Sequence, residues 1–288
     1  IPGGDVSSNG YNPIYAIRGI FPNYNPQVLV LINNIPITNV FLGDRSQAWG
    51  GMPVANIARI EVIRGPGSAL YGADAFSGVI NIVTKTSQDI KGFEFGTRVG
   101  SFQSKDVWVQ YGGKWLGLDA AFSIEYGKTD GHTRTVDADA QSSLDVLLGT
   151  SASLAPGPGN FGRESIEARL DLGKGNWRFR VGHQGRRKVG TGVGGAQALD
   201  PSGQSESDRS NADLTYQDPN FAKDWDITAQ ISYLDLVTRS DLVLFPPGAF
   251  NTIFPGAFAN GVLGNPYVYE RHTRAHVSAF YTGFNEHR

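Results

Sequence analysis

Hydrophobic and polar residues alternate along several stretches of the chain after residue 92. In 116–127 the even positions are Leu116, Leu118, Ala120, Phe122, Ile124 and Tyr126. The same alternation occurs in 93–100, 163–172 and 225–233, and less regularly in 105–115, 177–187, 209–217 and 269–283. Trp108 interrupts it in 105–115. A period of two is typical of β-strands with one apolar face, so the pattern predicts eight strands after residue 90.

Once the second strand is passed, the predicted connections alternate between short and long. Turns near 115–117, 173–176 and 218–224 are short, whereas 129–162, 188–208 and 239–268 are long and polar. Trp115, Trp177 and Trp225 stand beside the short turns, where an interfacial aromatic girdle would lie. This layout favours an outer-membrane β-barrel. A soluble β-sandwich also has alternating strands and stays an alternative, although its strands are usually shorter.

The first ninety residues have a different organisation. Short apolar runs between Gly, Asn and Pro turns predict strands over 14–18, 28–32, 59–63 and 79–84, and short helices over 53–58 and 68–75. We therefore predict a mixed α/β domain over 1–90, followed by antiparallel strands over 91–288. The chain opens on Ile1-Pro2-Gly3-Gly4 without a leader, so we expect a processed or truncated chain.

Composition excludes several classes of protein. The net charge of −2 provides no field that would attract nucleic acid, and the absence of cysteine removes disulfides and thiolate metal sites. The longest apolar run, Val28-Leu29-Val30-Leu31-Ile32, is too short for a membrane helix. Aromatic residues make up 11% of the chain, which argues against disorder because such a chain can bury a core.

One continuous motif carries a family resemblance. It includes Arg64-Gly65-Pro66-Gly67-Ser68-Ala69-Leu70-Tyr71-Gly72 and ends with Gly78-Val79-Ile80-Asn81-Ile82-Val83-Thr84-Lys85. Upstream lie Ala16-Ile17-Arg18-Gly19 and the run from 28 to 37, in which Asn34 stands where glycine is usual. These segments closely resemble the plug domain of TonB-dependent outer-membrane receptors.

The resemblance implies a plug inside a barrel of about 22 strands, of which about eight would be present here. It implies a receptor in the bacterial outer membrane, surrounded by outer-membrane lipid, that takes up a scarce nutrient by using the inner-membrane TonB complex. A ferric siderophore is the expected ligand class, with haem, cobalamin and oligosaccharides as alternatives. We expect no catalysis, cofactor, resident metal or nucleic-acid partner. The TonB box would precede residue 1, and a closed plugged barrel would need more strands.

The resemblance also assigns roles to individual residues. In the family, plug arginines pair with glutamates of the barrel wall, which implicates Arg18 and Arg64, while Arg59 and Glu61 supply further charge toward the wall. A solvated or locally paired arginine is the alternative. Ligand contacts would come from outward loops of the plug, namely Tyr11, Asn12, Tyr24, Asn25, Phe41, Arg45 and Trp49. Ordinary turn or wall contacts are the alternative for each of them.

The remaining motifs give no support for a nucleotide site, a shared histidine metal site or a calcium site. The glycine-rich run Gly190-Thr191-Gly192-Val193-Gly194-Gly195 has no βαβ context and is interpreted as a loop. His272 and His276 would lie about 13 Å apart on one strand, too far to share a metal. The acidic residues Asp130, Asp137, Asp139 and Asp145 suit a solvated loop better than a calcium site. A passive porin and a secreted β-sandwich that binds or hydrolyses carbohydrate remain as other classes, although no strong carboxylate pair stands out.

Overall fold

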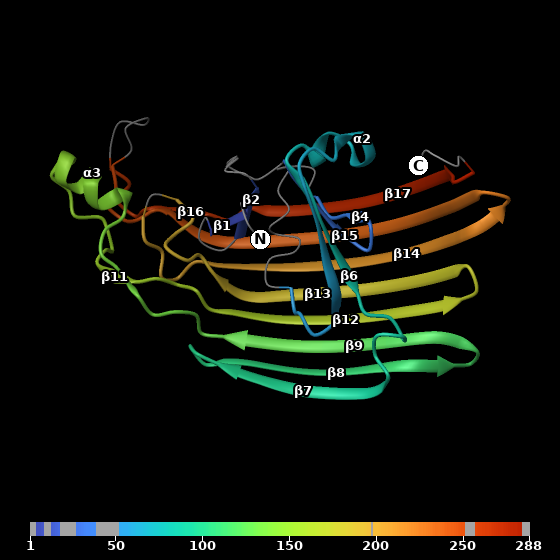
Figure 1. Ribbon diagram of the computed structural model, residues 1–288. Coiled ribbons are helices and arrows are strands. Elements are labelled where there is room, and N and C mark those ends of the chain that lie inside the picture. Colours follow the sequence, from blue (N-terminus) through green and yellow to red (C-terminus); the bar gives the residue numbers. More distant parts are fainter. Residues whose placement is uncertain are drawn as a thin grey trace.

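A computed structural model of the chain describes residues 4–8, 13–17, 27–38, 52–196, 198–250 and 257–283. Its two main parts are a small four-stranded sheet in the first ninety residues and a large antiparallel sheet that begins at Gly92. Figure 1 shows the small sheet lying across the long strands of the large one, with β6 crossing them at a steep angle. An α/β unit followed by a large antiparallel sheet is the predicted arrangement.

The small sheet has the strand order β4-β3-β6-β5. Its strands are β3 (Val28–Ile32), β4 (Ile35–Pro36), β5 (Ile57–Arg64) and β6 (Gly78–Thr84), and β3 runs parallel to β6. A separate hairpin contains β1 (Gly4–Ser8) and β2 (Pro13–Ile17). The four strands predicted in this region are confirmed. Asn34 has a φ of 67°, a left-handed backbone that glycine and asparagine tolerate best.

The helices of this region are confirmed only in part. Helix α2 (Ser68–Tyr71) and the 3₁₀ turn η1 (Ala73–Ala75) occupy the predicted 68–75 segment. The helix predicted over 53–58 is wrong. One turn closes there, with the Ile57 amide donating to the Val54 carbonyl at 3.1 Å, and Ile57 then begins β5. Pairing of β5 with β6 therefore overrides the local helix signal.

Eight long strands and one short strand form the large sheet among the described residues. The long strands are β7 (Gly92–Gly100), β8 (Ser104–Trp115), β9 (Leu118–Thr129), β12 (Arg163–Lys174), β13 (Trp177–Gly190), β14 (Gln204–Ala222), β15 (Trp225–Phe245) and β17 (Tyr267–Tyr281). Each long strand pairs with the next long strand along the chain. This up-and-down order confirms the eight predicted strands.

The strands run farther than the sequence pattern predicts, so the connections are shorter. Strand β14 continues to Ala222, and the turn predicted over 218–224 shrinks to two residues. The long loops hold further elements: β10 (Thr135–Val136), β11 (Gly157–Pro158), helix α3 (Ala140–Leu148) and β16 (Val262–Gly264). Figure 1 shows α3 at the end of the sheet opposite the short turns. The alternation of short turns and long loops is confirmed.

The two faces of the large sheet differ as the alternation predicts. We call the face that carries the small sheet the inner face, and the opposite one the outer face. Polar residues such as Ser232 are buried on the inner face, whereas Ile231 is 53% exposed on the outer face. Trp108 interrupts the alternation, as predicted, because it lies on the polar inner face, where its indole donates to Glu94 at 3.2 Å and its ring centroid lies 5.3 Å from the Arg98 guanidinium.

Trp115, Trp177 and Trp225 are exposed, and each stands at a strand end next to a short turn. Tyr216 packs against Trp177, and Tyr281 against Trp225, with ring centroids 5.0 and 5.2 Å apart. These contacts give the short-turn end of the sheet an aromatic border on its outer face. No helix among the described residues combines the length and the apolar character needed to cross a bilayer.

Candidate functional site

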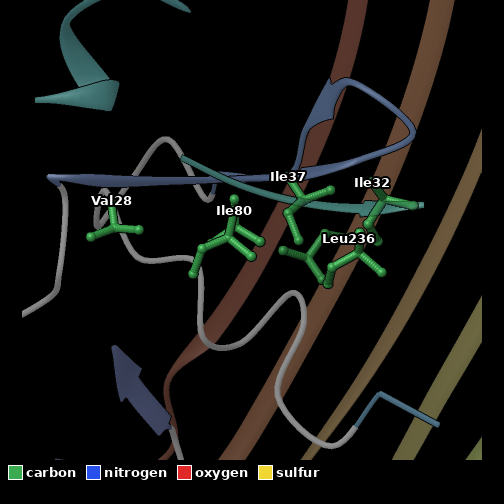
Figure 2. Packing of buried hydrophobic residues seen from close by; sticks show 7 residues of the cluster. Val28, Ile32, Ile37, Ile80 and Leu236 are labelled. Atoms are coloured by element: carbon green, nitrogen blue, oxygen red, sulfur yellow. The ribbon is translucent and has the colours of Figure 1, made fainter. Parts of the chain in front are cut away.

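The candidate site is the region where the small sheet meets the inner face of the large one. An apolar cluster fills one face of the small sheet, and it includes Leu236 from β15, which is 1% exposed. Figure 2 shows Leu236 beside Ile32 and Ile37 of the small sheet. A side chain of the large sheet thus completes the apolar core of the N-terminal domain.

Direct hydrogen bonds also join the two domains, at strands of the large sheet other than the one that carries Leu236. The Ala55 amide donates to the Glu125 carboxylate of β9 at 2.8 Å, and Lys85 Nζ donates to Gln110 Oε1 of β8 at 3.1 Å. Glu125 and Gln110 are buried, 5% and 1% exposed respectively. Both lie on the polar face of their strands, so the period-two alternation places them where the small sheet sits.

The inner face beneath the small sheet carries buried charge. Glu167 and Arg169 form an ion pair two positions apart on β12. Arg180 donates to both oxygens of Asp213 across β13 and β14, at 2.7 to 3.0 Å. Because each of these buried charges has a partner of opposite charge, the inner face stays polar and avoids the cost of an unpaired ion in a low-dielectric interior.

A small gap separates the domains beside this charge. Polar residues of both sheets line it, including Asn33, Asn56 and Thr84 from the N-terminal domain and Asp171 and Arg180 from the wall. The contact is therefore partly apolar, at Leu236, and partly polar. It differs from the continuous apolar packing inside the small sheet.

The chain passes from one domain to the other through a close contact. A Cβ atom built on Gly112 of β8 would lie 1.9 Å from the Ile90 carbonyl oxygen. Ile90 is 1% exposed and stands two residues before Gly92, the start of the first strand of the large sheet. Only glycine leaves room for the connecting segment at this position.

The charges predicted at the plug surface are found on β5. Arg59 Nε lies 2.8 Å from Glu61 Oε1, and Asn81 donates to the other Glu61 oxygen at 2.8 Å. The hydrogen bonds from Asn81 and Arg59 lower the pKa of Glu61 below its ordinary value. Arg59 and Arg64 are exposed on this edge strand of the small sheet. Arg18 lies outside the described residues.

The predicted ligand contacts all fall outside the described residues. They are Tyr11, Asn12, Tyr24, Asn25, Phe41, Arg45 and Trp49. Their assignment stays a prediction. The structure does describe long loops at the far end of the large sheet, whose folding the sequence pattern did not reveal.

Two aspartates organise the first long loop. Asp139 caps α3 by accepting from the Ser142 amide at 2.7 Å, and it also accepts from the Leu199 amide of the next long loop at 2.7 Å. Asp145 accepts from the Ala152 and Ser153 amides at 2.9 and 2.7 Å. Desolvation raises the pKa of each, but these hydrogen bonds outweigh it and lower both pKa values overall.

These hydrogen bonds give Asp139 and Asp145 structural partners in place of a cation. Asp200 plays a similar part, since its carboxylate accepts from the Gly203 amide at 2.7 Å and from the Val243 amide at 2.9 Å. No cluster of three or more His, Cys, Asp or Glu that could hold a metal occurs among the described residues. The run 190–195 lies at the end of β13 and in the following loop, as predicted.

Sequence reasoning missed the wall residues of the interface. Leu236, Glu125, Gln110 and Arg169 occupy inner positions of strands that the alternation identified correctly. Charged residues on the polar face were the available signal for Glu125 and Arg169. The signal for Leu236 was different: a leucine stands at a position where the alternation predicts a polar side chain.

Comparisons with known proteins agree with this geometry. Residues 1–79 match the family model of the TonB-dependent receptor plug domain. The vitamin B12 transporter BtuB of Vibrio vulnificus (strain CMCP6) is 38% identical over 110 residues, which are 37% of this chain and 17% of that protein.

Solved structures share the fold at low sequence identity. A mutant of the ferric enterobactin receptor PfeA from Pseudomonas aeruginosa, in complex with enterobactin, has a TM-score of 0.56 at 17% identity, covering 95% of this chain and 42% of that one. The FrpB iron transporter from Neisseria meningitidis has a TM-score of 0.57 at 16% identity, covering 83% and 37%. The chain thus spans about two fifths of these structures and a sixth of the curated relative.

Proposed function

Because the chain is part of a TonB-dependent receptor, with a plug domain followed by part of an outer-membrane β-barrel, we propose that the whole protein actively takes up a scarce small-molecule nutrient. Its energy would come from the inner-membrane partner TonB, which pulls on the plug. The reaction is transport and release, with no covalent change to the ligand.

The plug sheet seated on the polar inner face of the barrel wall is the observation that carries this proposal. A plug blocks passive diffusion, which argues against an open porin. It must also move when energy is supplied. The hydrogen bonds from Ala55 to Glu125 and from Lys85 to Gln110 hold the plug in place and can still be broken when it moves, because each contributes only about 0.5–3 kcal/mol.

We propose residues 1–90 as the plug and 91–288 as the first part of the barrel. The change from the four-stranded sheet to the large sheet supports this division. We further propose that Arg18 and Arg64 pair with wall glutamates in the complete barrel. Arg59 and Glu61, which pair with each other, would face the same wall.

For the ligand we propose a ferric siderophore. Its support is the fold shared with a ferric enterobactin receptor and an iron transporter. Cobalamin is the second candidate, because a relative 38% identical over 110 residues is a vitamin B12 transporter. Contacts would come from Tyr11, Asn12, Tyr24, Asn25, Phe41, Arg45 and Trp49, whose aromatic rings and polar groups suit a chelated ligand.

Energised uptake tests the proposal. Cells expressing the full-length gene are given a panel of radio-iron siderophores and radiolabelled cobalamin, with and without TonB. Uptake of a siderophore that requires TonB would support the proposal, and TonB-dependent uptake of cobalamin alone would replace the ligand. Accumulation that is equal without TonB would refute the receptor and favour a porin. Trp49→Ala should weaken binding of the accepted ligand, whereas Trp115→Ala, beside a short turn of the large sheet, should not.

A further inference from the structure

Three titratable side chains line the inner face of β17, the last described strand of the large sheet. Glu270, His272 and Arg274 occupy alternate positions, so they point to the same face of the sheet. Glu270 lies directly opposite Leu236, the wall leucine that packs into the plug. The three side chains therefore stand beside the contact between plug and wall.

Hydrogen bonds join these side chains in a row. Nε2 of His272 lies 3.0 Å from Glu270 Oε2, and Nδ1 of His272 lies 3.2 Å from Arg274 Nη2. The side chains of His272 and Glu270 are only 12% and 11% exposed. Opposite His272 and Arg274 on β15 stand residues that do not titrate, Leu234 and Ser232. Among the described residues, Glu270 and Arg274 are thus the charged groups in contact with His272.

The two contacts of His272 require a neutral imidazole. A guanidinium can only donate, so Nδ1 accepts the hydrogen bond from Arg274 and carries no proton. Nε2 then carries the single ring proton and donates it to the Glu270 carboxylate. The ring bridges an anion and a cation, and it can do so only in this one tautomer.

Arg274 also interacts with the plug. The carboxylate of Asp74, in the 3₁₀ turn η1, lies close enough to attract the Arg274 guanidinium. Arg274 is half-buried, so water screens this attraction less than it would at an open surface. His272 thus holds a cation of the wall in position toward an anion of the plug.

A second proton on the His272 ring would break this arrangement. It can only go to Nδ1, where it would face the donor hydrogens of Arg274, a group of like charge. Histidine is the side chain whose ordinary titration falls between about pH 5 and 8. We propose that His272 is a pH-sensitive switch of the plug. The neutral ring orients Arg274 toward Asp74 and keeps the plug seated, and the protonated ring displaces Arg274 and loosens the plug.

Channel openings of the full-length receptor in a planar lipid bilayer test the switch, recorded at about pH 7.5 and about pH 5.5. Loss of a charge-assisted contact should make openings about 10-fold more frequent at the lower pH. His272→Gln keeps a donor and an acceptor but cannot be protonated, so its openings should be equally rare at both pH values. The matched control is His276→Gln, an exposed histidine four residues farther along β17, which should keep the full pH dependence.

Two further variants imitate the loosened state. His272→Lys places a permanent charge beside Arg274, and Arg274→Gln removes the cation that faces the plug, so both should open often at either pH. Heat-modifiable migration identifies the variants that fold. Equal opening of the unmodified receptor at both pH values would overturn the inference. So would a pH dependence that survives in His272→Gln or, if that variant does not fold, in Arg274→Gln.

The switch depends on the plug and the wall but not on the nutrient proposed above. Uptake with and without TonB is therefore measured in parallel. TonB-dependent uptake by a receptor whose openings do not change with pH refutes the switch alone. Openings that depend on pH and on His272, without any uptake, refute only the proposed receptor function.

Discussion

Leu236 offers a quantitative test of how the plug is held in the barrel. It is a wall residue, 1% exposed, that lies within the apolar cluster of the plug. Leu236→Ala removes three carbons, worth about 2.4 kcal/mol of transfer free energy at about 0.8 kcal/mol per methylene. The cavity left behind adds to this, within the range of about 2–5 kcal/mol measured for such changes.

The free energy lost in Leu236→Ala comes from the contact between the plug and the wall. A change of about 2.4 kcal/mol shifts the ratio of displaced to seated plug about 50-fold toward displacement. The full-length receptor with Leu236→Ala, placed in a planar lipid bilayer, should show frequent channel openings that the unmodified receptor seldom shows. Entry of a bulky antibiotic into intact cells should rise in parallel.

Leu242→Ala is the matched control for Leu236→Ala. Leu242 lies on the same strand and the same face and is 7% exposed, but it packs near Gly195 in an external loop. The same three carbons are lost there without loosening the plug. If both variants opened equally often, or if Leu236→Ala stayed as closed as the unmodified receptor, Leu236 would not secure the plug.

Four further predictions follow from contacts described above. Glu125→Ala leaves the half-buried Ala55 amide without its acceptor and should cost about 1–3 kcal/mol, seen as faster hydrogen exchange at that amide, whereas Glu125→Gln keeps an acceptor and should change exchange less. Ile231→Arg places charge on the lipid-facing side and should lower folding stability in vesicles by about 2–4 kcal/mol near mid-membrane, while Ser232→Ala should not. Gly112→Val collides with the Ile90 carbonyl and should reduce heat-modifiable, folded receptor in the outer membrane, while Gly117→Asn, in an open turn, should be tolerated. Because the pKa values of Asp139 and Asp145 are lowered, both carboxylates stabilise the loops above about pH 4. Protection of the Leu199 and Ser153 amides from hydrogen exchange, corrected for intrinsic exchange rates, should therefore hold from pH 7 to 5 and decline below about pH 4. An equal decline in the Asp139→Ala variant would contradict this explanation.

The sequence pattern predicted the barrel strands because a wall between lipid and plug imposes a period of two. Trp225 and Ile231 had to be apolar, and Gln230 and Ser232 polar, so the assignment of faces needed no structure. The ends of β14 and β15 were harder to predict. These strands extend beyond the apolar band of the barrel. There both faces of the sheet meet water, so the residue types no longer alternate between apolar and polar.

The interface between plug and wall resisted prediction for a different reason. Leu236 breaks the alternation, and only the neighbouring Ile32 and Ile37, about two hundred residues earlier in the chain, explain why leucine is needed there. The missed helix α3 is similar. Its cap Asp139 was identified only as part of an acidic loop, because the bonds that define its role come from Ser142 and from Leu199, sixty residues away.

The same alternation that builds the barrel wall also distinguishes the wall strands from the loops that connect them. Each wall strand commits one face to lipid and the other to the plug, so the connecting loops are the segments free of both constraints. Asp139 joins its loop to Leu199 of the next long loop, and Asp200 joins that second loop to Val243 near the end of β15, so a change in the first loop alters the surface of the second. Exchanging loop 130–162 alone for that of another receptor should therefore destabilise loop 191–203, and only a joint exchange should transfer ligand preference. Transfer of preference by the single exchange would show that the loops act independently.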